Sequence, residues 1–528
     1  MLRMRKREKQ KGNGGDHSSE IRNRPLSNNI EENLKYLREI FNNCSDVVFR
    51  EFLLAQREQI KLAMIYIDGL TDKTRVSEEI MKALALEVPM ATSNTEITKA
   101  NALHYIKMRG LCINKIKETG NFSDVINAVL SGNTVLLVDG NNTAIINETQ
   151  GWEKRSIEES KTEIIVRGPR ESFVETLSTN TSMLRRKIKN PDLKIETMEL
   201  GEKTNTQVAL VYVAGIVNEG LVEEARKRLS RIKIDGILES GYIEEFISDN
   251  PYTVFPTIAH TDRPDRVAAY LLEGRVAIMV EGTPVVLTAP SIFMESIQTP
   301  EDYYERAVFM SAIRGLRILT MILAMTLPSL YVAIISFHHE MLPTPLLLSI
   351  ASQREAVPLP VFVEVLFMEI AFEIIREAGI RLPRPVGQAV SIVAALIIGE
   401  AAVTAGMVAG TTIIVVPMTA IASFTVYYSG SIAFRTLRFP LVFLAASLGL
   451  FGLITGLIII VVHMASLRSF GIPYLEPIAP IVPGDLKDSA LRAPWWAIKR
   501  GPNLMGQNNP RRAVPGMKPK PPTVNKRE

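Results

Sequence analysis

One segment of this chain is far poorer in charged residues than the rest. Residues 318–467 contain 13 charged side chains in 150 positions, whereas the whole chain of 528 residues has 60 Lys and Arg and 56 Asp and Glu. Apolar stretches longer than about 18 residues exceed what a small soluble core can bury and match the thickness of a bilayer. The sequence therefore predicts a membrane region and excludes a wholly soluble protein.

Four membrane spans can be counted in this region. Residues 318–337 are uncharged and would form a helix of about 30 Å. Residues 386–434 carry Glu400 as their one charge and are too long for a single span, so we expect the chain to fold back between Gly406 and Gly410, with Pro417 in the later span. Residues 439–467 form the fourth span. The predicted transmembrane domain covers residues 306–467.

A glutamate-rich stretch lies between the first two spans, within residues 341–385. Glu369, Glu373 and Glu377 recur at every fourth position and so share one face of a helix. Such a face does not suit lipid. We expect either an amphipathic or re-entrant helix at the interface, or a helix that faces a water-filled vestibule in which the carboxylates attract cations. A fifth span through this stretch also stays open.

The charges at both ends of the chain predict where the ends lie. Residues 468–528 carry 11 basic and four acidic side chains, which places the tail in the cytoplasm. With four spans the N-terminus is cytoplasmic too, and its basic start lacks the apolar core of a secretory signal. We expect disordered basic segments at 1–32 and 501–528, and a membrane-proximal cytoplasmic segment at 468–500. Its Trp495 and Trp496 suit either the lipid headgroup zone or packing on the soluble part.

The polar half of the chain contains an internal repeat. One apolar run stops at Gly69 and again at Gly215, and another reaches Asp139-Gly140 and again Glu281-Gly282. Both acid-glycine pairs look like hairpin turns rather than catalytic acids. We predict two related α/β modules, residues 33–159 and 160–305, in which these glycines are equivalent. The alternative is a chance resemblance between two α/β domains, and strand order decides between the two.

Residues suited to catalysis are scarce. The sequence has no phosphate-binding loop, no nucleophile elbow and no His-Glu-x-x-His motif, and Cys44 and Cys112 are too few for a structural metal. The cluster His338-His339-Glu340 consists of neighbours that point in different directions, and we expect it at the water boundary of the first span. We predict no enzyme activity, no cofactor, no bound metal and no nucleic-acid partner.

Glu400 lies well inside an otherwise uncharged span. An ionisable group at that depth is costly when it faces lipid, so it is expected to face protein or water. Its helical face would combine a hydrophobic constriction with a polar ring just beyond it. The residues of this face are Val393, Leu396, Ile397, Glu400, Thr404 and Met407. We predict that they line a pore; a protonated Glu400 bonded to a neighbouring helix is the structural alternative.

Seven motifs in order carry a family resemblance. They begin at Arg167 (Arg-Gly-Pro-Arg-Glu-Ser-Phe), Asn180 (Asn-Thr-Ser-Met-Leu-Arg-Arg-Lys-Ile), Glu273 (Glu-Gly-Arg-Val-Ala-Ile), Gln298 (Gln-Thr-Pro-Glu-Asp-Tyr-Tyr), Met368 (Met-Glu-Ile-Ala-Phe-Glu), Arg376 (Arg-Glu-Ala-Gly-Ile-Arg-Leu-Pro) and Phe470 (Phe-Gly-Ile-Pro-Tyr-Leu). Together, over about residues 33–500, they resemble the A subunit of the GerA family of bacterial spore germinant receptors. One departure is Gly399-Glu400-Ala-Ala-Val403, where the family pattern would have Gln.

The resemblance implies a multi-pass protein of the spore inner membrane. It also implies a transporter-like B subunit and a lipoprotein C subunit as partners, and a homo-oligomer, expected as a pentamer, around an ion-conducting pore. The function expected is a nutrient-gated release of monovalent cations. The alternatives are a non-conducting receptor scaffold that signals through its soluble modules, and the closely similar A-like subunit associated with the dipicolinic-acid release channel. A secondary transporter is disfavoured because the membrane half shows no inverted repeat.

Overall fold

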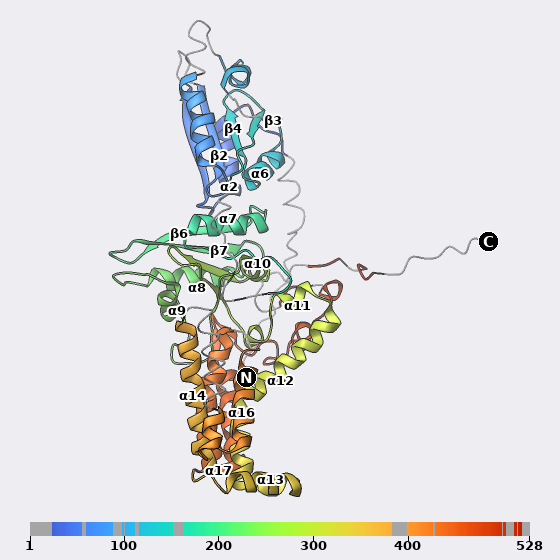
Figure 1. Ribbon diagram of the computed structural model, residues 1–528. Helices are drawn as coiled ribbons and strands as arrows, with labels where there is room; N and C mark the ends of the chain where they lie inside the picture. The colour runs from blue at the N-terminus through green and yellow to red at the C-terminus, as the bar shows by residue number, and fades with distance from the viewer. Residues whose placement is uncertain are drawn as a thin grey trace, which may run out of the picture.

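The computed structural model describes residues 24–54, 60–87, 98–99, 101–110, 116–151, 160, 163, 165–382, 399–425, 428–498, 500–502, 512–514 and 516–519. Figure 1 shows an elongated molecule in which two sheet-containing modules are stacked on a bundle of long helices. The C-terminal segment returns to the level of the second module.

The first module is a five-stranded antiparallel sheet with helices. Its order of elements is α2 (Ile30–Ile40), β1 (Val47–Leu54), β2 (Ile60–Ile67), α3 (Lys73–Arg75), the π-helical turns η1 (Val76–Met81) and η2 (Ala83–Glu87), α5 (Ala102–Tyr105), η3 (Ile106–Gly110), β3 (Ile116–Thr119), α6 (Phe122–Leu130), β4 (Thr134–Val138) and β5 (Ala144–Asn147). The strand order is β1-β2-β4-β5-β3. Strands β4 and β5 are buried along their whole length, because helices α2 and α6 pack on one face and the η1 to η3 region on the other. Helix α2 begins at Ile30 and so crosses the boundary expected near residue 33.

The second module repeats this arrangement. Its elements are α7 (Leu177–Lys187), β6 (Leu193–Leu200), β7 (Thr206–Val213), α8 (Glu219–Ser230), α9 (Ser240–Ile247), β8 (Ala259–Thr261), α10 (Pro264–Leu271), β9 (Val276–Val280), β10 (Val286–Ala289), the 3-10 turn η4 (Phe293–Ser296) and α11 (Glu301–Tyr304). The strand order is β6-β7-β9-β10-β8, with every neighbouring pair antiparallel. Replacing each strand of the first sheet by the one five places later gives this order, which confirms the predicted duplication.

The equivalent glycines follow equivalent strands. Gly69 and Gly215 each lie two residues beyond the second strand of their sheet, β2 or β7, with φ of 82° and 78°, and Gly140 and Gly282 follow the central strands β4 and β9 with φ of 84° and 91°. These are left-handed backbone conformations that side chains with a Cβ rarely adopt, so glycine is required in both copies.

The acidic residues before the second pair of glycines have a structural task. The Asp139 carboxylate accepts a hydrogen bond from the backbone N–H of Ile30 at 3.4 Å, and the Glu281 carboxylate accepts one from Leu177 N–H at 2.7 Å. Ile30 and Leu177 are the first residues of α2 and α7. In each module the hairpin turn therefore satisfies an otherwise unpaired donor at a helix N-terminus.

A buried ion pair joins the two modules. Arg185 of α7 donates from Nε and Nη2 to the two carboxylate oxygens of Asp46, at 2.7 and 2.9 Å, and both side chains are buried. Beside it the backbone of Ile195 at the start of β6 exchanges hydrogen bonds with Asn43 and Ser45. The chain ahead of β1 thus extends the second sheet, and the two modules are held by backbone as well as by charge.

The helical region follows the second module. It contains α12 (Ala307–Phe337), η5 (His339–Met341), α13 (Thr344–Arg354), α14 (Val361–Arg381), α16 (Gly410–Ser423) and α17 (Tyr428–Ser466). Among the described residues two helices are long and apolar enough to cross a membrane, Ala307–Phe337 and Gly430–Ser466. Of the four predicted spans, the first lies within Ala307–Phe337, whereas residues 386–398 of the second lie outside the described residues.

Helix α17 is a hairpin, and the predicted single span at residues 439–467 is wrong. Gly449 has φ of 60° and ψ of −141°, values that no helix contains. A Cβ on Gly456 would lie 2.6 Å from Leu441, so residues 450–466 pack back along residues 428–448. Each half has about the length of a bilayer core.

Contacts near the ends of the long helices show in which direction each helix runs. Gly449 lies against Phe337 at the end of α12, whereas Gly430 lies against Ser296 and His463 against Thr253, both in the second module. The described helices α12, α14 and α16 and the two halves of α17 run side by side between a module end and a far end (Figure 1). The chain does turn at Gly406, which has φ of 64°, ahead of α16 with its internal Pro417.

The last described segment lies against the second module and α12. It contains β11 (Arg468–Ser469), β12 (Ile472–Pro473), and the 3-10 turns η6 (Leu486–Asp488) and η7 (Trp495–Ala497). Ser469 Oγ donates to Thr257 O and accepts from Ser291 N–H at 3.0 Å, and Tyr474 is buried among Phe255 and Phe293. Residues of the segment expected to be membrane-proximal are thus packed between the second module and the helices.

Candidate functional site

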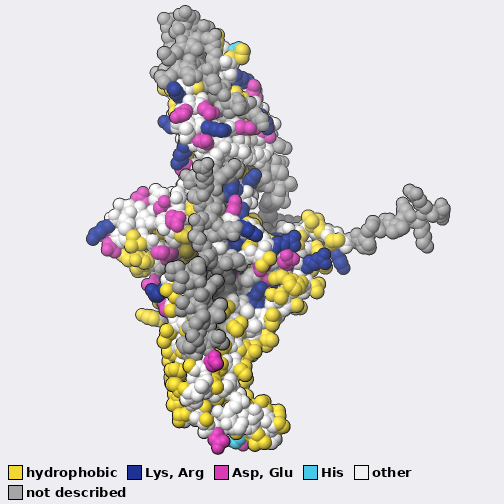
Figure 2. Space-filling model, viewed as in Figure 1, with side chains coloured by type: hydrophobic (Ala, Val, Ile, Leu, Met, Phe, Trp, Pro, Cys, Tyr) yellow, Lys and Arg dark blue, Asp and Glu magenta, His cyan; other side chains and the backbone are white. Residues whose placement is uncertain are grey.

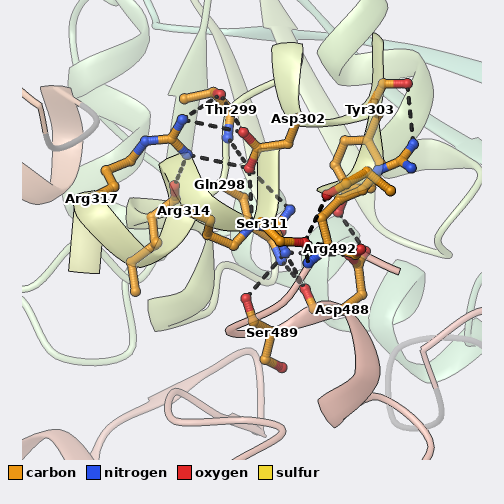
Figure 3. Close-up of polar contacts among 12 residues, drawn as sticks. Gln298, Thr299, Asp302, Tyr303, Ser311, Arg314, Arg317, Asp488, Ser489 and Arg492 are labelled. Atoms are coloured by element: carbon orange, nitrogen blue, oxygen red, sulfur yellow. Dashed lines mark hydrogen bonds and ion pairs between the residues drawn. The ribbon is translucent and has the colours of Figure 1, made fainter. Parts of the chain in front are cut away.

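A buried charge cluster joins the second module to the first long helix. Asp302 of α11 is fully buried and accepts hydrogen bonds from two arginines of α12, from Arg314 Nε at 3.0 Å and from Arg317 Nη2 at 3.2 Å. The arginines are three positions apart, so they lie on one helical face directly before the apolar run (Figure 3). We call Asp302, Arg314 and Arg317 the junction cluster. It ties the start of α12 rigidly to the module.

The C-terminal segment completes this junction. Arg314 Nη1 donates to the backbone oxygens of Asp488 and Ser489, at 2.6 and 3.1 Å, and the Asp488 carboxylate accepts from the Tyr303 hydroxyl at 2.6 Å (Figure 3). Burial raises the pKa of the Asp488 carboxyl even though Tyr303 and Arg314 stabilise its charge. Burial also raises the pKa of Tyr303 well above its usual range, and the charge of Asp488 adds to this. Helices α11 and α12, which are neighbours in sequence, thus meet the distant C-terminal segment around one buried guanidinium.

Trp495 packs on the same junction. Its ring lies 5.6 Å from that of Tyr303, and its indole N–H donates to Tyr303 O at 3.2 Å, while half of the side chain stays exposed. A cavity of about 490 Å³ lies beside it, lined by Tyr270, Tyr304 and Asp265 among others. Trp495 thus packs on the soluble part, and its place relative to the lipid headgroups stays a prediction.

A second charge cluster lies among the long helices. Glu369 of α14 is buried and contacts Arg438 of α17 at 2.7 Å, and Glu373 contacts Arg438 at 3.1 Å, Arg376 at 3.2 Å and also Arg435. Because a paired carboxylate attracts a further cation less strongly, these contacts weaken the vestibule hypothesis for both residues. Whether the glutamate face attracts cations stays a prediction.

Glu377 differs from the other two glutamates. Its side chain is 61% exposed, and it pairs with Arg381 on its own helix, where Arg381 Nε donates at 2.7 Å. An exposed pair of this kind is weak, because water screens both charges. Of the three glutamates predicted to attract cations, Glu377 is therefore the one available at the surface of the protomer.

Glu364 was not singled out from the sequence, yet it holds a helix end. Its fully buried carboxylate accepts from the backbone N–H of Ala409 at 3.0 Å and from Thr412 Oγ1 at 3.3 Å, and it contacts Arg354 of α13 at 2.9 Å. Ala409 is the N-cap of α16 and Thr412 lies in its first turn, where backbone donors lack partners. Glu364 thus fixes α16 to α14 at the far end.

The predicted pore face is only partly described. Val393, Leu396 and Ile397 lie outside the described residues. Glu400, Thr404 and Met407 are described and exposed, and Thr404 Oγ1 donates to the backbone oxygen of Glu400 at 2.8 Å, so both belong to one helical turn. The assignment of all six residues to a pore stays a prediction.

Within the described residues no group of three or more His, Cys, Asp and Glu could hold a metal ion. His338 and His339 lie where α12 ends and η5 begins, and His338 Nδ1 is 3.3 Å from Ala333 O. The free thiol of Cys44 is buried between the modules, and this burial raises its pKa. This arrangement offers packing rather than reactivity.

The fold and its junction define a class of protein: two related soluble modules joined by buried ion pairs to a bundle of apolar helices. Comparison with known sequences gives the family. The profile described as Bacillus/Clostridium GerA spore germination protein matches residues 35–504, so the chain belongs to the GerA family, whose germinant receptor A subunits it resembles.

Individual relatives agree with this assignment. The chain is 43% identical to spore germination protein KA of Bacillus subtilis (strain 168), over 94% of this chain and 90% of that protein. It is 42% identical to the uncharacterized membrane protein YfkQ of the same strain, over 94% of this chain and 95% of that one. A crystal structure of the N-terminal domain of the A subunit of the Bacillus megaterium spore germinant receptor GerK3 is 38% identical, with a TM-score of 0.41, covering 51% of this chain and 98% of that one.

Several family motifs supply the contacts described above. The motif at Gln298 provides Asp302 and Tyr303, the motif at Asn180 provides Arg185, and the motif at Met368 provides Glu369 and Glu373. Sequence reasoning used these motifs for recognition and missed their task. The available signal was the pair Arg314 and Arg317 directly ahead of an apolar run, where charge is costly without a partner.

Proposed function

We propose that this chain is the membrane subunit of a spore germinant receptor that releases monovalent cations in response to nutrients, as a nutrient-gated channel formed by several copies. A pentamer in the spore inner membrane, with a transporter-like B subunit and a lipoprotein C subunit, is the assembly that the family resemblance implies. The observation that carries the proposal is the exposure of Glu400, with Thr404 and Met407, on the surface of the single chain.

An exposed carboxylate in this position requires a polar neighbour. An acidic side chain that faces lipid costs about 2.5 to 3.5 kcal/mol at the centre of a bilayer on insertion scales, and Glu400 lies between that depth and the far-end turn at Gly406. Ala401, Val403 and Met407 around Glu400 are also exposed, so the protomer itself offers little shelter on this side. A second copy of the chain, or water enclosed by several copies, would supply the missing surroundings. Both outcomes favour an oligomer with this face inward.

The ends of the helices support a topology. The module end holds the start of α12 and the end of α17, which favours soluble modules and C-terminal segment on one side, the cytoplasm in our proposal. Helix α14 runs from the far end, where Phe362 contacts Phe443, to the module end, where Arg376 donates to Ser423 at 3.1 Å. The open alternative of a span through the glutamate stretch is therefore preferred, with its carboxylates neutralised by arginines.

A route for gating follows from the contacts. The junction cluster ties the second module to α12, and Tyr331 of α12 is hydrogen-bonded to Thr411 and Thr412 of α16 at 2.8 and 3.1 Å. Helix α16 follows directly on the turn after Glu400. A movement of the module would thus be transmitted through α12 and α16 to the pore face.

Cation flux through reconstituted protein tests the proposal. The purified chain in liposomes is expected to pass monovalent cations, Glu400→Gln to lower the flux several-fold, and Ile397→Ala to raise the basal leak. Glu340→Gln is the matched control, because Glu340 is 79% exposed at the far end and lies 4.0 Å from its neighbour His339. If the parent protein passes no cations, the scaffold alternative replaces the channel. If all variants assemble and conduct alike, this face does not line the ion path.

A further inference from the structure

A group of apolar side chains is exposed on the second module. They come from α9 and the loops on either side of it, and their exposed fractions are 68% for Leu238, 43% for Tyr242, 55% for Phe246, 96% for Tyr252 and 38% for Val254. We call these five residues the α9 patch. An exposed cluster of large apolar and aromatic side chains is a common sign of a binding surface.

The patch lies beside the module end of the long helices. Thr253, between Tyr252 and Val254, has its Oγ1 3.0 Å from His463 Nε2 near the end of α17. Phe255 packs against His463 and Phe434, at ring distances of 6.0 and 6.4 Å. In Figure 1 α9 lies directly above the end of α14. The patch is therefore at the level where these helices leave the apolar layer.

The chemistry of the patch suits the boundary of a bilayer. Tyr242 and Tyr252 each combine an apolar ring with a hydroxyl, the type of side chain that is enriched at membrane interfaces. Figure 2 shows hydrophobic side chains at the lower edge of the second module, above the apolar outer surface of the helices. The patch thus continues a surface that already faces lipid in the proposed topology.

Charge does not drive this contact. Arg468, at the end of α17, is exposed, but Glu239, Glu245 and Asp249 on and beside α9 are exposed too, so the neighbourhood is acidic rather than basic. Attraction to anionic lipids would need an excess of positive charge. Insertion of the aromatic and aliphatic side chains is the contribution that remains.

We propose that the α9 patch inserts into the headgroup and upper acyl region of the membrane leaflet that faces the modules, and so docks the second module on the lipid surface. The inference rests on the proposed function, because it requires the long helices to span the bilayer. Docking would hold the module at a fixed height while the junction cluster transmits its movement to α12. Membrane thickness and composition would then influence the module directly.

Quenching by brominated lipid tests this proposal on the full chain in liposomes. The native tryptophans are replaced (Trp152→Phe, Trp495→Phe, Trp496→Phe), and one reporter is introduced at a time. Tyr252→Trp reports on the patch, Leu53→Trp on an exposed apolar site of β1 in the first module, and Phe451→Trp on the exposed outer surface of α17. Lipids brominated near the headgroup and lipids brominated deep in the chain are used in parallel.

The expected result is at least twofold quenching at Tyr252→Trp by the shallow bromine, and none at Leu53→Trp. Adding Tyr242→Ser and Phe246→Ser should reduce the quenching at Tyr252→Trp to the level at Leu53→Trp. Equal, weak quenching at these two positions overturns the docking. A blue-shifted but unquenched emission at Tyr252→Trp overturns it as well and indicates a protein partner on the patch. Absence of quenching at Phe451→Trp by either lipid would instead refute membrane insertion, and with it the proposed function.

Discussion

Replacing the central carboxylate of the junction cluster should weaken the chain far more than replacing an exposed one. In Asp302→Asn the shape of the side chain is kept, but the buried Arg317 loses its counter-charge, whereas Arg314 retains the Asp488 carboxylate at 3.3 Å. Breaking a buried ion pair by removing one partner costs about 3 to 5 kcal/mol. The matched control is Glu51→Gln, which removes an ion pair to Arg38 whose side chains are 42% and 56% exposed. Exposed pairs contribute about 0 to 1 kcal/mol.

Trp495 allows this effect to be measured at the junction itself, because it lies against Tyr303. A chain with Trp152→Phe and Trp496→Phe is placed in nanodiscs and titrated with urea, following the fluorescence of Trp495. With a slope of about 2 kcal/mol per M, a loss of about 4 kcal/mol moves the local unfolding midpoint down by about 2 M, whereas Glu51→Gln moves it by less than about 0.5 M. Nanodiscs keep the helices in lipid during the titration.

The double variant separates charge from packing. Adding Arg317→Met to Asp302→Asn removes the guanidinium that has lost its carboxylate while keeping apolar bulk, so part of the lost stability should return. Equal midpoints for Asp302→Asn and Glu51→Gln would refute the reasoning. If the midpoint of the double variant lies below that of Asp302→Asn by as much as Arg317→Met alone lowers the parent's midpoint, the effects are additive and the two residues act independently.

Two further predictions concern one module residue and one helix bend. Burial, with the nearby charges of Glu239 and Glu245, raises the pKa of Glu244 to about 7. A raised carboxyl pKa means that the folded chain favours the protonated form, so ionisation of Glu244 destabilises the second module increasingly as the pH rises from about 4.5 through 7. Glu244→Gln should therefore gain up to about 3 kcal/mol of unfolding free energy relative to the parent at pH 8 and nothing at pH 4. Thermal unfolding at both pH values checks this, and an equal gain at both would contradict it. Gly449→Ala should lower the thermal unfolding midpoint, because a φ of 60° strains a residue with a Cβ by about 1 to 3 kcal/mol and that Cβ would lie 2.7 Å from His338. The control Gly315→Ala, where a Cβ meets nothing within 4 Å, should be neutral or stabilising. Similar midpoints for the two variants would argue against a tight bend at Gly449.

Local patterns in the sequence predicted a large part of this architecture. The charge-poor region, the chain reversal near Gly406 and the repeated modules all follow from properties of neighbouring residues: charge density, glycine position and strand length. The repeat was predictable because each copy needs the same glycines at Gly69 and Gly215, where the backbone enters the left-handed region in both. A requirement for glycine concerns a single position, so it can be recognised in the sequence without knowledge of the fold.

Helix boundaries inside a uniformly apolar stretch were not predictable in the same way. Residues 439–467 read as one span because nothing in their composition marks a turn, and Gly449 is one of several small residues there. In the folded chain this glycine alone bends the backbone, since the two halves of α17 can then pack on each other and on α12. The decision between a long helix and a hairpin depends on packing against other helices, which the local sequence does not contain.

The sequence alone therefore determined the class of protein, its repeated modules and the family to which it belongs, whereas the partners of its charges were decided by tertiary structure. Glu369 and Glu373 look like a free acidic face in one dimension, yet their partners Arg435 and Arg438 come from a helix more than 60 residues later. Arg314 finds Asp488 at a separation of 174 residues. From the sequence alone one can infer only that a buried charge needs a partner, because burying an unpaired charge is costly. Which residue becomes that partner depends on what lies beside the charge in space, and this is decided when the chain folds.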